Sequence, residues 1–171
     1  MFGLFKRKPV QSGPITFDFD ILIERPVKEV YPLIDWADPR NAKRQLGHKV
    51  EGDGSRYVLT ITGMPEHRFN FDIAEAKPNE IYAYSCDIQP RVGRLAHGHE
   101  SYTFEKTEEG HCLLRLVNTV QFVDGLSRRD LEHEMMVMSV ATSDSLAKLK
   151  IMAELGFDAA KAVENASFVG S

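Results

Sequence analysis

The chain has 171 residues, of which 43% are hydrophobic and 27% are charged, as in soluble globular proteins of one domain. Its net charge is −4, and because Lys6, Arg7 and Lys8 supply three positive charges, the rest of the chain carries −7. An acidic body argues against nucleic acid as the main partner, and no apolar run approaches the roughly 20 residues that span a membrane.

The first residues, 1–13, are expected to form a loose N-terminal arm without a signal peptide, because their apolar stretch is short and precedes the cations. The segment "ITFDFDILIER" then alternates strictly between apolar and polar residues. This pattern predicts a half-buried strand whose apolar face consists of Phe17, Phe19, Ile21 and Ile23.

Two short helices are predicted after this strand. Pro26 ends the strand and suits the first turn of a helix, in which apolar residues recur at helical spacing despite Pro32. The segment "DPRNAKRQL" predicts the second helix, with Asp38 as its N-cap and Pro39 just inside it.

From Gly47 to Phe122 the pattern changes to strands and turns. Residues 48–55 and 56–63 predict a hairpin, and alternation continues over 67–76, 80–88, 98–106 and 112–122. Links of turn length between short strands predict an antiparallel sheet. Ser127 then caps a long helix that Gly156 ends, and we expect it to bury against the sheet an apolar stripe of Leu131, Met135, Met138, Leu146, Leu149 and Met152.

This order resembles the START-like, or SRPBCC, superfamily, which includes the Bet v 1 allergens and polyketide cyclase-like proteins. The resemblance covers about residues 15–155 and rests on "ILIERPVKEVYPLIDWADP", "YTFEKTEEGHCLLRLVNTV" and the C-terminal amphipathic helix. It implies an α+β helix-grip fold, a curved antiparallel sheet of about seven strands around the long helix, over residues 14–155. Residues 156–171 would be a tail that could hold a short helix. These motifs specify a fold and carry no shared catalytic residue.

The hairpin "GHESYTFEKTEEGHCLLRLVNTVQF" places one hydrogen-bonding residue on each of two apolar faces, Glu100 and Asn118. A tight turn at Thr107–Gly110 sets Glu100 opposite Asn118, and a turn near residues 89–94 brings Tyr84 close to Glu100 from the other side. A buried carboxylate needs donors of this kind. Either the row lines a cavity and binds a ligand, or it satisfies itself, or a bulge turns Glu100 outward.

In the family, a cavity lies between the sheet and the long helix, and members bind lipids, sterols, quinones, hormones or polyketides. The candidate cavity residues, none of them assigned as catalytic, are Glu100, Asn118, Tyr84, Tyr82, Tyr102, Phe69, Phe71, Met135 and Met138. The methionines could pack the core, adapt to a ligand, or do both.

Metal, cofactor and disulfide chemistry are not expected. His97 and His99 have H-x-H spacing, but they fall on the face opposite Glu100 and lack a nearby third ligand. Cys86 and Cys112 lie on separated strands, so we expect reduced thiols in a cytoplasmic protein.

The sequence therefore predicts a non-enzymatic protein that binds a small hydrophobic ligand, such as a lipid, an isoprenoid or a polyketide-like molecule. One alternative is a cyclase- or hydratase-like enzyme that uses Glu100 and Tyr84, and another is a protein-interaction module with a filled cavity. The oligomeric state is left open. The arm could also make weak contact with an anionic membrane through Phe2, Leu4, Phe5, Lys6, Arg7 and Lys8.

Overall fold

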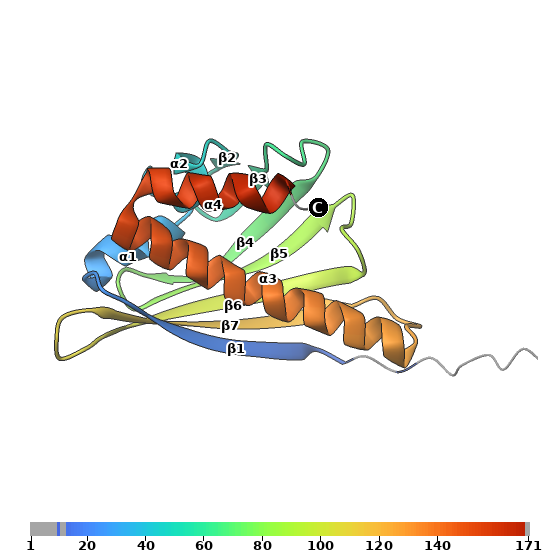
Figure 1. Cartoon of the computed structure of the whole chain (residues 1–171). Helices are drawn as coiled ribbons and strands as arrows, with labels where there is room; N and C mark the ends of the chain where they lie inside the picture. The colour runs from blue at the N-terminus through green and yellow to red at the C-terminus, as the bar shows by residue number, and fades with distance from the viewer. Residues whose placement is uncertain (1–9, 11–12, 170–171) are drawn as a thin grey trace, which may run out of the picture.

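A seven-stranded antiparallel sheet forms the body of the protein in the computed structural model, which describes residues 10 and 13–169 and side chains up to residue 166 (Figure 1). The strand order is β1-β7-β6-β5-β4-β3-β2, so only the β1–β7 pair joins segments far apart in the chain. This arrangement confirms the predicted helix-grip class. The strands are β1 (Ile15–Ile23), β2 (Lys49–Gly52), β3 (Arg56–Thr60), β4 (Arg68–Lys77), β5 (Ile81–Gln89), β6 (Leu95–Lys106) and β7 (Cys112–Phe122).

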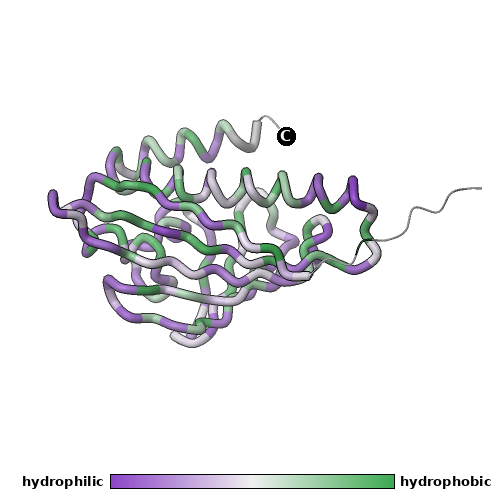
Figure 2. The backbone as a smooth tube through the Cα atoms, turned by 90° about the horizontal axis from the view of Figure 1, so that it is seen from below, coloured by the Kyte–Doolittle hydropathy of each residue, from purple (hydrophilic) through white to green (hydrophobic). Residues whose placement is uncertain are grey.

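The inner face of the sheet follows directly from the alternation in the sequence. In β7 every second residue from Cys112 to Phe122 is buried, while the residues between them are half-buried or exposed. Figure 2 shows the corresponding change between hydrophobic and hydrophilic positions along the strands. Because successive side chains of a strand point to opposite faces, one face of the sheet is free to receive the helices.

The described residues also form four helices: α1 (Val27–Ile34), α2 (Ala42–Gln45), α3 (Arg128–Leu155) and α4 (Phe157–Val169). The Ser127 hydroxyl accepts a hydrogen bond from the Asp130 amide at 3.2 Å and caps α3. Gly156, with a φ of 86°, ends α3 in a conformation that glycine adopts without strain. The chain then reverses, and α4 runs back alongside α3 (Figure 1).

The predicted start of the second short helix was wrong. Asp38 accepts hydrogen bonds from the amide and the guanidinium of Arg40, the latter at 2.8 Å, and thereby closes a local turn. A side chain that satisfies nearby backbone in this way competes with helix formation. The helix begins later, at Ala42, where Asn41 is the N-cap and its Oδ1 accepts from the Lys43 amide at 3.0 Å.

The apolar stripe of α3 is buried only in its second half. Leu146, Leu149 and Met152 are buried, as predicted, within the main hydrophobic cluster. The first half of the helix packs against a second, separate cluster around Val120, Phe122 and Leu126. The residues that it contributes are less buried than predicted: Leu131, Met135 and Met138. The long helix thus holds two hydrophobic clusters, and it packs mainly over β1 and β7 rather than across the whole sheet.

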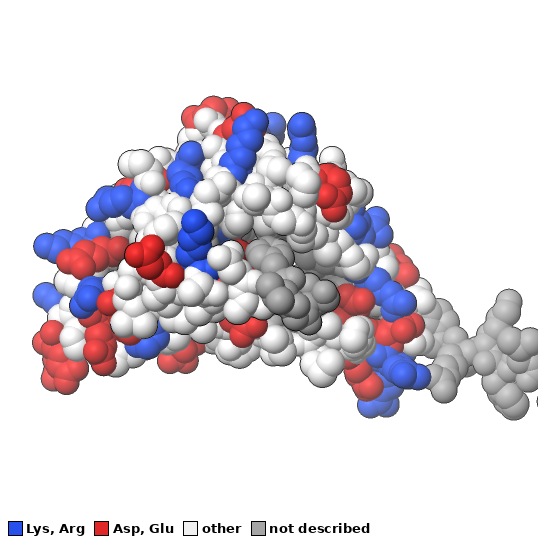
Figure 3. Space-filling model, turned by 45° about the horizontal axis from the view of Figure 1, so that its top comes forward, with Lys and Arg blue, Asp and Glu red and all other residues white. Residues whose placement is uncertain are grey.

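The surface view in Figure 3 shows cationic and anionic side chains interspersed over one face. Within residues 13–169, no helix is long and apolar enough to cross a membrane. The arm residues proposed for membrane contact lie outside the described residues. Val10 is described, and its amide donates to the carbonyl of Leu126 at 3.0 Å, which places this point of the arm beside the start of α3.

Candidate functional site

The predicted polar row is centred on Glu100, on the inner face of the sheet. In the observed register, Glu100 lies opposite Asn118 on β7 and opposite Tyr84 on β5, as predicted. The strands carry no bulge at this position, since the irregularity between β6 and β7 lies at Leu95–His97. The carboxylate is therefore turned inward, where it is half-buried.

Two tyrosines hold one oxygen of the Glu100 carboxylate. The hydroxyl groups of Tyr84 and Tyr102 both donate to Oε2, at 2.6 Å and 2.8 Å. Burial, followed by the charge of Glu100, raises the pKa of both phenols well above the usual value, so they remain donors near neutral pH. Among the described residues no donor reaches the other oxygen, Oε1. Glu100 thus presents one free acceptor.

Asn118 lies opposite Glu100, but its side-chain amide serves a different partner. Its Nδ2 donates to the hydroxyl of Thr142 on α3 at 3.0 Å and lies 3.8 Å from the sulfur of Met138. The Thr142 hydroxyl in turn donates to the Met138 carbonyl at 2.9 Å. Asn118 and Thr142 are both buried, so this contact ties the middle of α3 to the sheet between its two hydrophobic clusters.

Beside Glu100, the inner face of the sheet carries a glycine, Gly98. Gly98 faces inward two residues before Glu100, paired with Cys86 on β5 and Val120 on β7. It is buried, yet among the described residues a methyl group built at its Cα would meet only the Cys86 carbonyl oxygen, at 3.9 Å. A glycine within a strand marks a point where another group can approach the backbone closely. The free oxygen of Glu100 and this open position are neighbours along one strand face.

The other predicted cavity residues divide into two groups. Tyr82 and Phe71 are core residues: Tyr82 accepts a hydrogen bond from the Trp36 amide at 3.1 Å, and Phe71 stacks on Trp36 at 4.4 Å between ring centroids. Phe69, Met135 and Met138 are half-buried. Whether any of these residues touches a ligand remains a prediction.

Sequence reasoning missed a group of charged residues on the helical side of this space: Lys43 on α2, His48 after it, Lys148 on α3 and Glu164 on α4. His48 Nδ1 accepts from the Thr62 amide at 3.3 Å, so Nε2 carries the proton, and it lies 3.4 Å from Glu164 Oε1. The Lys148 ammonium lies 3.0 Å from Glu164 Oε2.

The neighbours of Glu164 favour its ionised form. The hydrogen bond from His48, helped by the Lys43 and Lys148 charges, overcomes burial and lowers the pKa of Glu164 to about 2. The one available signal in the sequence was the spacing of Ala160 and Glu164, which puts both on one face of a helix in the predicted tail. Nothing in that spacing indicates the partner His48, because the contact spans 116 residues.

The histidines near Glu100 lie on the outer face, and burial disfavours the reactive thiolate form of the cysteines. His97 contacts Asp87 at 2.9 Å and His99 contacts Ser85 at 3.3 Å, both on the outer face. No group of three or more potential metal-ligating side chains occurs within the described residues. Burial raises the pKa of both thiols, that of Cys112 to about 11.

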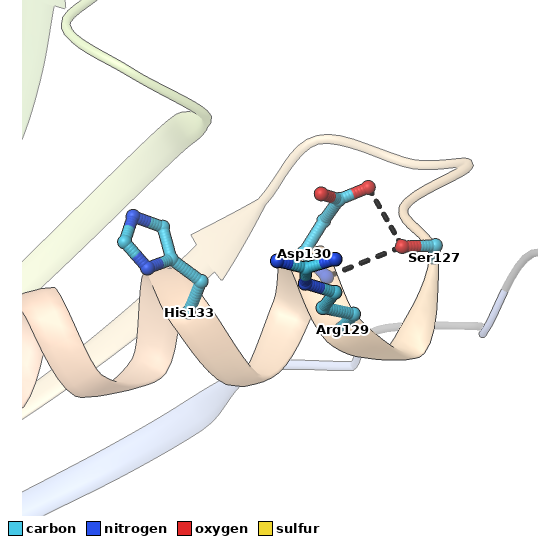
Figure 4. A pocket seen from close by; sticks show the side chains of 4 residues that line it. All are labelled: Ser127, Arg129, Asp130 and His133. Atoms are coloured by element: carbon cyan, nitrogen blue, oxygen red, sulfur yellow. Dashed lines mark hydrogen bonds between the residues drawn. The ribbon is translucent and has the colours of Figure 1, made fainter.

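A separate surface pocket of about 470 Å³ lies at the first turn of α3, lined by Ser127, Arg129, Asp130 and His133 (Figure 4). The Asp130 carboxylate turns back to the Ser127 hydroxyl, which donates to it at 2.7 Å (Figure 4). The helix N-terminus in this pocket is therefore already occupied by a carboxylate of the chain itself.

Comparisons with known proteins identify the fold through solved structures and not through sequence. No family model and no curated protein matches the sequence. The Aha1 dimer structure from Colwellia psychrerythraea is 16% identical, with a TM-score of 0.60, and the match covers 83% of this chain and 98% of that one. Ara h 8.0201 is 13% identical, with a TM-score of 0.61 over 81% of this chain and 95% of that one.

A third solved structure with this architecture is an enzyme. Norcoclaurine synthase from Thalictrum flavum, determined in complex with dopamine and hydroxybenzaldehyde, is 8% identical with a TM-score of 0.57. The match covers 84% of this chain and 86% of that one. At these identities the likeness concerns the fold and not the activity. The chain has the helix-grip fold of the START-like, or Bet v 1-like, proteins that its motifs resemble.

Proposed function

We propose that the protein binds a small apolar molecule that carries a hydroxyl group, with the hydroxyl donating to Glu100 Oε1 and the apolar body lying over Gly98. The observation that carries this proposal is an acceptor that no described donor reaches, two residues from a buried glycine at which an added methyl group would meet no described atom closer than 3.9 Å. Close packing of a core favours neither an unused acceptor nor a glycine at an inward strand position.

The walls around this space suit such a molecule. Tyr84 and Tyr102 flank Glu100, and Cys86 on β5 is half-buried next to Gly98. Proteins with this fold bind hydrophobic ligands, and norcoclaurine synthase holds two hydroxylated aromatic molecules, dopamine and hydroxybenzaldehyde. These cases support the class of ligand that we propose, an apolar skeleton with a hydrogen-bonding group.

We favour ligand binding over a catalytic role for Glu100 and Tyr84. A general acid or base works best when its pKa lies near the operating pH. Burial and the Glu100 charge move the pKa of Tyr84 in the opposite direction, well above its usual value. Tyr84 therefore orients Glu100 as a fixed donor, and Glu100 acts as an anchor for the ligand.

The test uses 2-naphthol, whose intrinsic fluorescence reports binding, and 2-methoxynaphthalene, which has the same skeleton without the donor. Glu100→Gln places a donor where the free acceptor stood, because the phenols continue to donate to the amide oxygen. We expect it to weaken 2-naphthol binding by about 1–3 kcal/mol and to leave the methoxy compound unaffected or tighter. Glu105→Gln, on the exposed outer face of β6, is the matched control.

Gly98→Leu provides an independent arm, since its backbone conformation accepts any residue and the larger side chain would occupy the position proposed for the ligand. It should abolish binding of both naphthalenes while thermal unfolding shows a folded protein. Unchanged 2-naphthol affinity in both Glu100→Gln and Gly98→Leu would remove the proposal.

A further inference from the structure

The backbone of Lys43 on α2 is fixed by two hydrogen bonds. Its amide donates to Asn41 Oδ1 at 3.0 Å, and its carbonyl accepts from the His48 amide at 3.0 Å. Asn41 is 1% exposed and donates to the carbonyls of Ile34 and Asp35, so the cap is itself fixed to the end of α1. The direction in which the Lys43 side chain leaves α2 is therefore set by the fold.

The Lys43 ammonium faces charged groups from three other elements, which are Glu164 on α4, Lys148 on α3 and Glu100 on β6. Both carboxylates are already engaged, Glu164 by His48 and Lys148, and Oε2 of Glu100 by the two phenols. Within the described part of the chain, Lys43 Nζ forms no hydrogen bond or ion pair. It is a half-buried amine without a direct partner among the described residues, and the charge of Glu100 acts on it from the sheet.

We propose that Lys43 binds a carboxylate of the ligand, so that the site selects apolar hydroxy acids, with the hydroxyl on Glu100 and the carboxylate on Lys43. This inference rests on the proposed function and specifies its ligand class. A cation with no partner in a low-dielectric space is the group for which an added anion gives the largest gain.

Removal from water also changes the proton equilibrium of this amine. Burial lowers the pKa of Lys43 below its usual value, although the neighbouring Glu164 and Glu100 partly oppose the effect. A carboxylate bound to the amine favours its charged form, so binding should be accompanied by proton uptake at a pH near the lowered pKa. The uptake is assigned to Lys43 by its loss in a variant.

The experiment compares 2-naphthol, which has only the donor, with 2-naphthoate, which has only the carboxylate. Lys43→Met keeps the length and apolar stem of the side chain. We expect it to lower 2-naphthoate affinity at least about tenfold and to change 2-naphthol affinity less than about threefold. Glu100→Gln should give the reverse pattern. Lys49→Met, which removes an exposed cation paired with Glu51, is the matched control and should change neither affinity.

Calorimetry of 2-naphthoate binding to the unmodified protein in phosphate and in Tris adds a measurement that needs no variant. The buffer dependence should show proton uptake that increases with pH and disappears in Lys43→Met. The inference is overturned if 2-naphthoate does not bind, if no protons are taken up, or if Lys43→Met weakens both probes equally or neither. In each of these cases intact 2-naphthol binding, sensitive to Glu100→Gln and Gly98→Leu, leaves the proposed function standing. Failure of 2-naphthol itself would count against the proposed function.

Discussion

Replacement of Glu164 by glutamine should destabilise the protein through α4, because it removes the negative charge that His48, Lys148 and Lys43 surround. Glu164 is 7% exposed and His48 is 8% exposed, so little water is available to take over the role of the carboxylate. The glutamine keeps the shape and can still accept a hydrogen bond from His48. The lost term is therefore mainly the interaction of the charge with its two cationic neighbours and the histidine.

The size of the effect follows from the proton affinity of the carboxyl group. Its pKa falls from an ordinary value of 4.5 to about 2 on folding. At about 1.4 kcal/mol for each tenfold change in proton affinity, this corresponds to about 3 kcal/mol of folding free energy at neutral pH. Because the remaining amide retains part of the hydrogen bonding, we expect Glu164→Gln to cost about 2–3 kcal/mol at pH 7.

The pH dependence gives the sharper result. A carboxyl group with a lowered folded pKa contributes fully above its unfolded pKa, and the contribution is lost as the pH falls from 4.5 towards about 2. Urea unfolding of both proteins between pH 7 and pH 3 should therefore show a difference that shrinks below pH 4.5. Glu51→Gln removes an exposed charge paired with Lys49 at 2.9 Å and should cost less than about 0.5 kcal/mol at any pH. A Glu164→Gln difference that stays constant with pH would refute the reasoning.

Two further predictions concern the core and the arm. Leu149→Ala should cost about 2–5 kcal/mol in urea unfolding, because Leu149 lies in the main hydrophobic cluster, whereas the exposed Val140→Ala should cost less than about 0.5 kcal/mol. Deletion of residues 1–9 should weaken sedimentation with anionic liposomes and leave binding to neutral liposomes unchanged. Equal sedimentation of the full and shortened chains would exclude a membrane role for the arm.

Much of the fold could be predicted because its signals are local. Strand alternation, the turn at Thr107–Gly110 and the caps at Ser127 and Gly156 each depend on residues close in sequence. Once two turns were placed, counting residues along the strands set Glu100 opposite Asn118 and Tyr84. The prediction of Asp38 as a helix cap was wrong because local signals were ambiguous there. Asp38 and Asn41 are both good caps three residues apart, and only the folded chain shows which one starts the helix.

The chemistry of the site could be predicted only in part. The inward direction of Glu100 follows from strand period, but the choice of Tyr102 instead of Asn118 as its second donor depends on side-chain rotamers and on Thr142 of a helix packed above. Lys43 showed no pattern in the sequence, and Glu164 showed only its helical spacing to Ala160. Each belongs to a short or terminal segment and acquires its role from residues far along the chain. Such contacts are set by tertiary packing, which propensity and periodicity do not encode.

The division of α3 between two hydrophobic clusters has a consequence for local opening. Its second half shares a large core with α1, α4 and most strands, whereas its first half rests on a small cluster of half-buried side chains around Phe122. Amide groups near Met135 should therefore exchange with deuterium through brief detachment of that half, well before those near Leu149, which await global unfolding. Asn118 and Thr142 mark the boundary between the two regimes. Each opening of the first half would uncover the inner face of β7 next to Gly98 and give a molecule a way in without disturbing the rest of the protein.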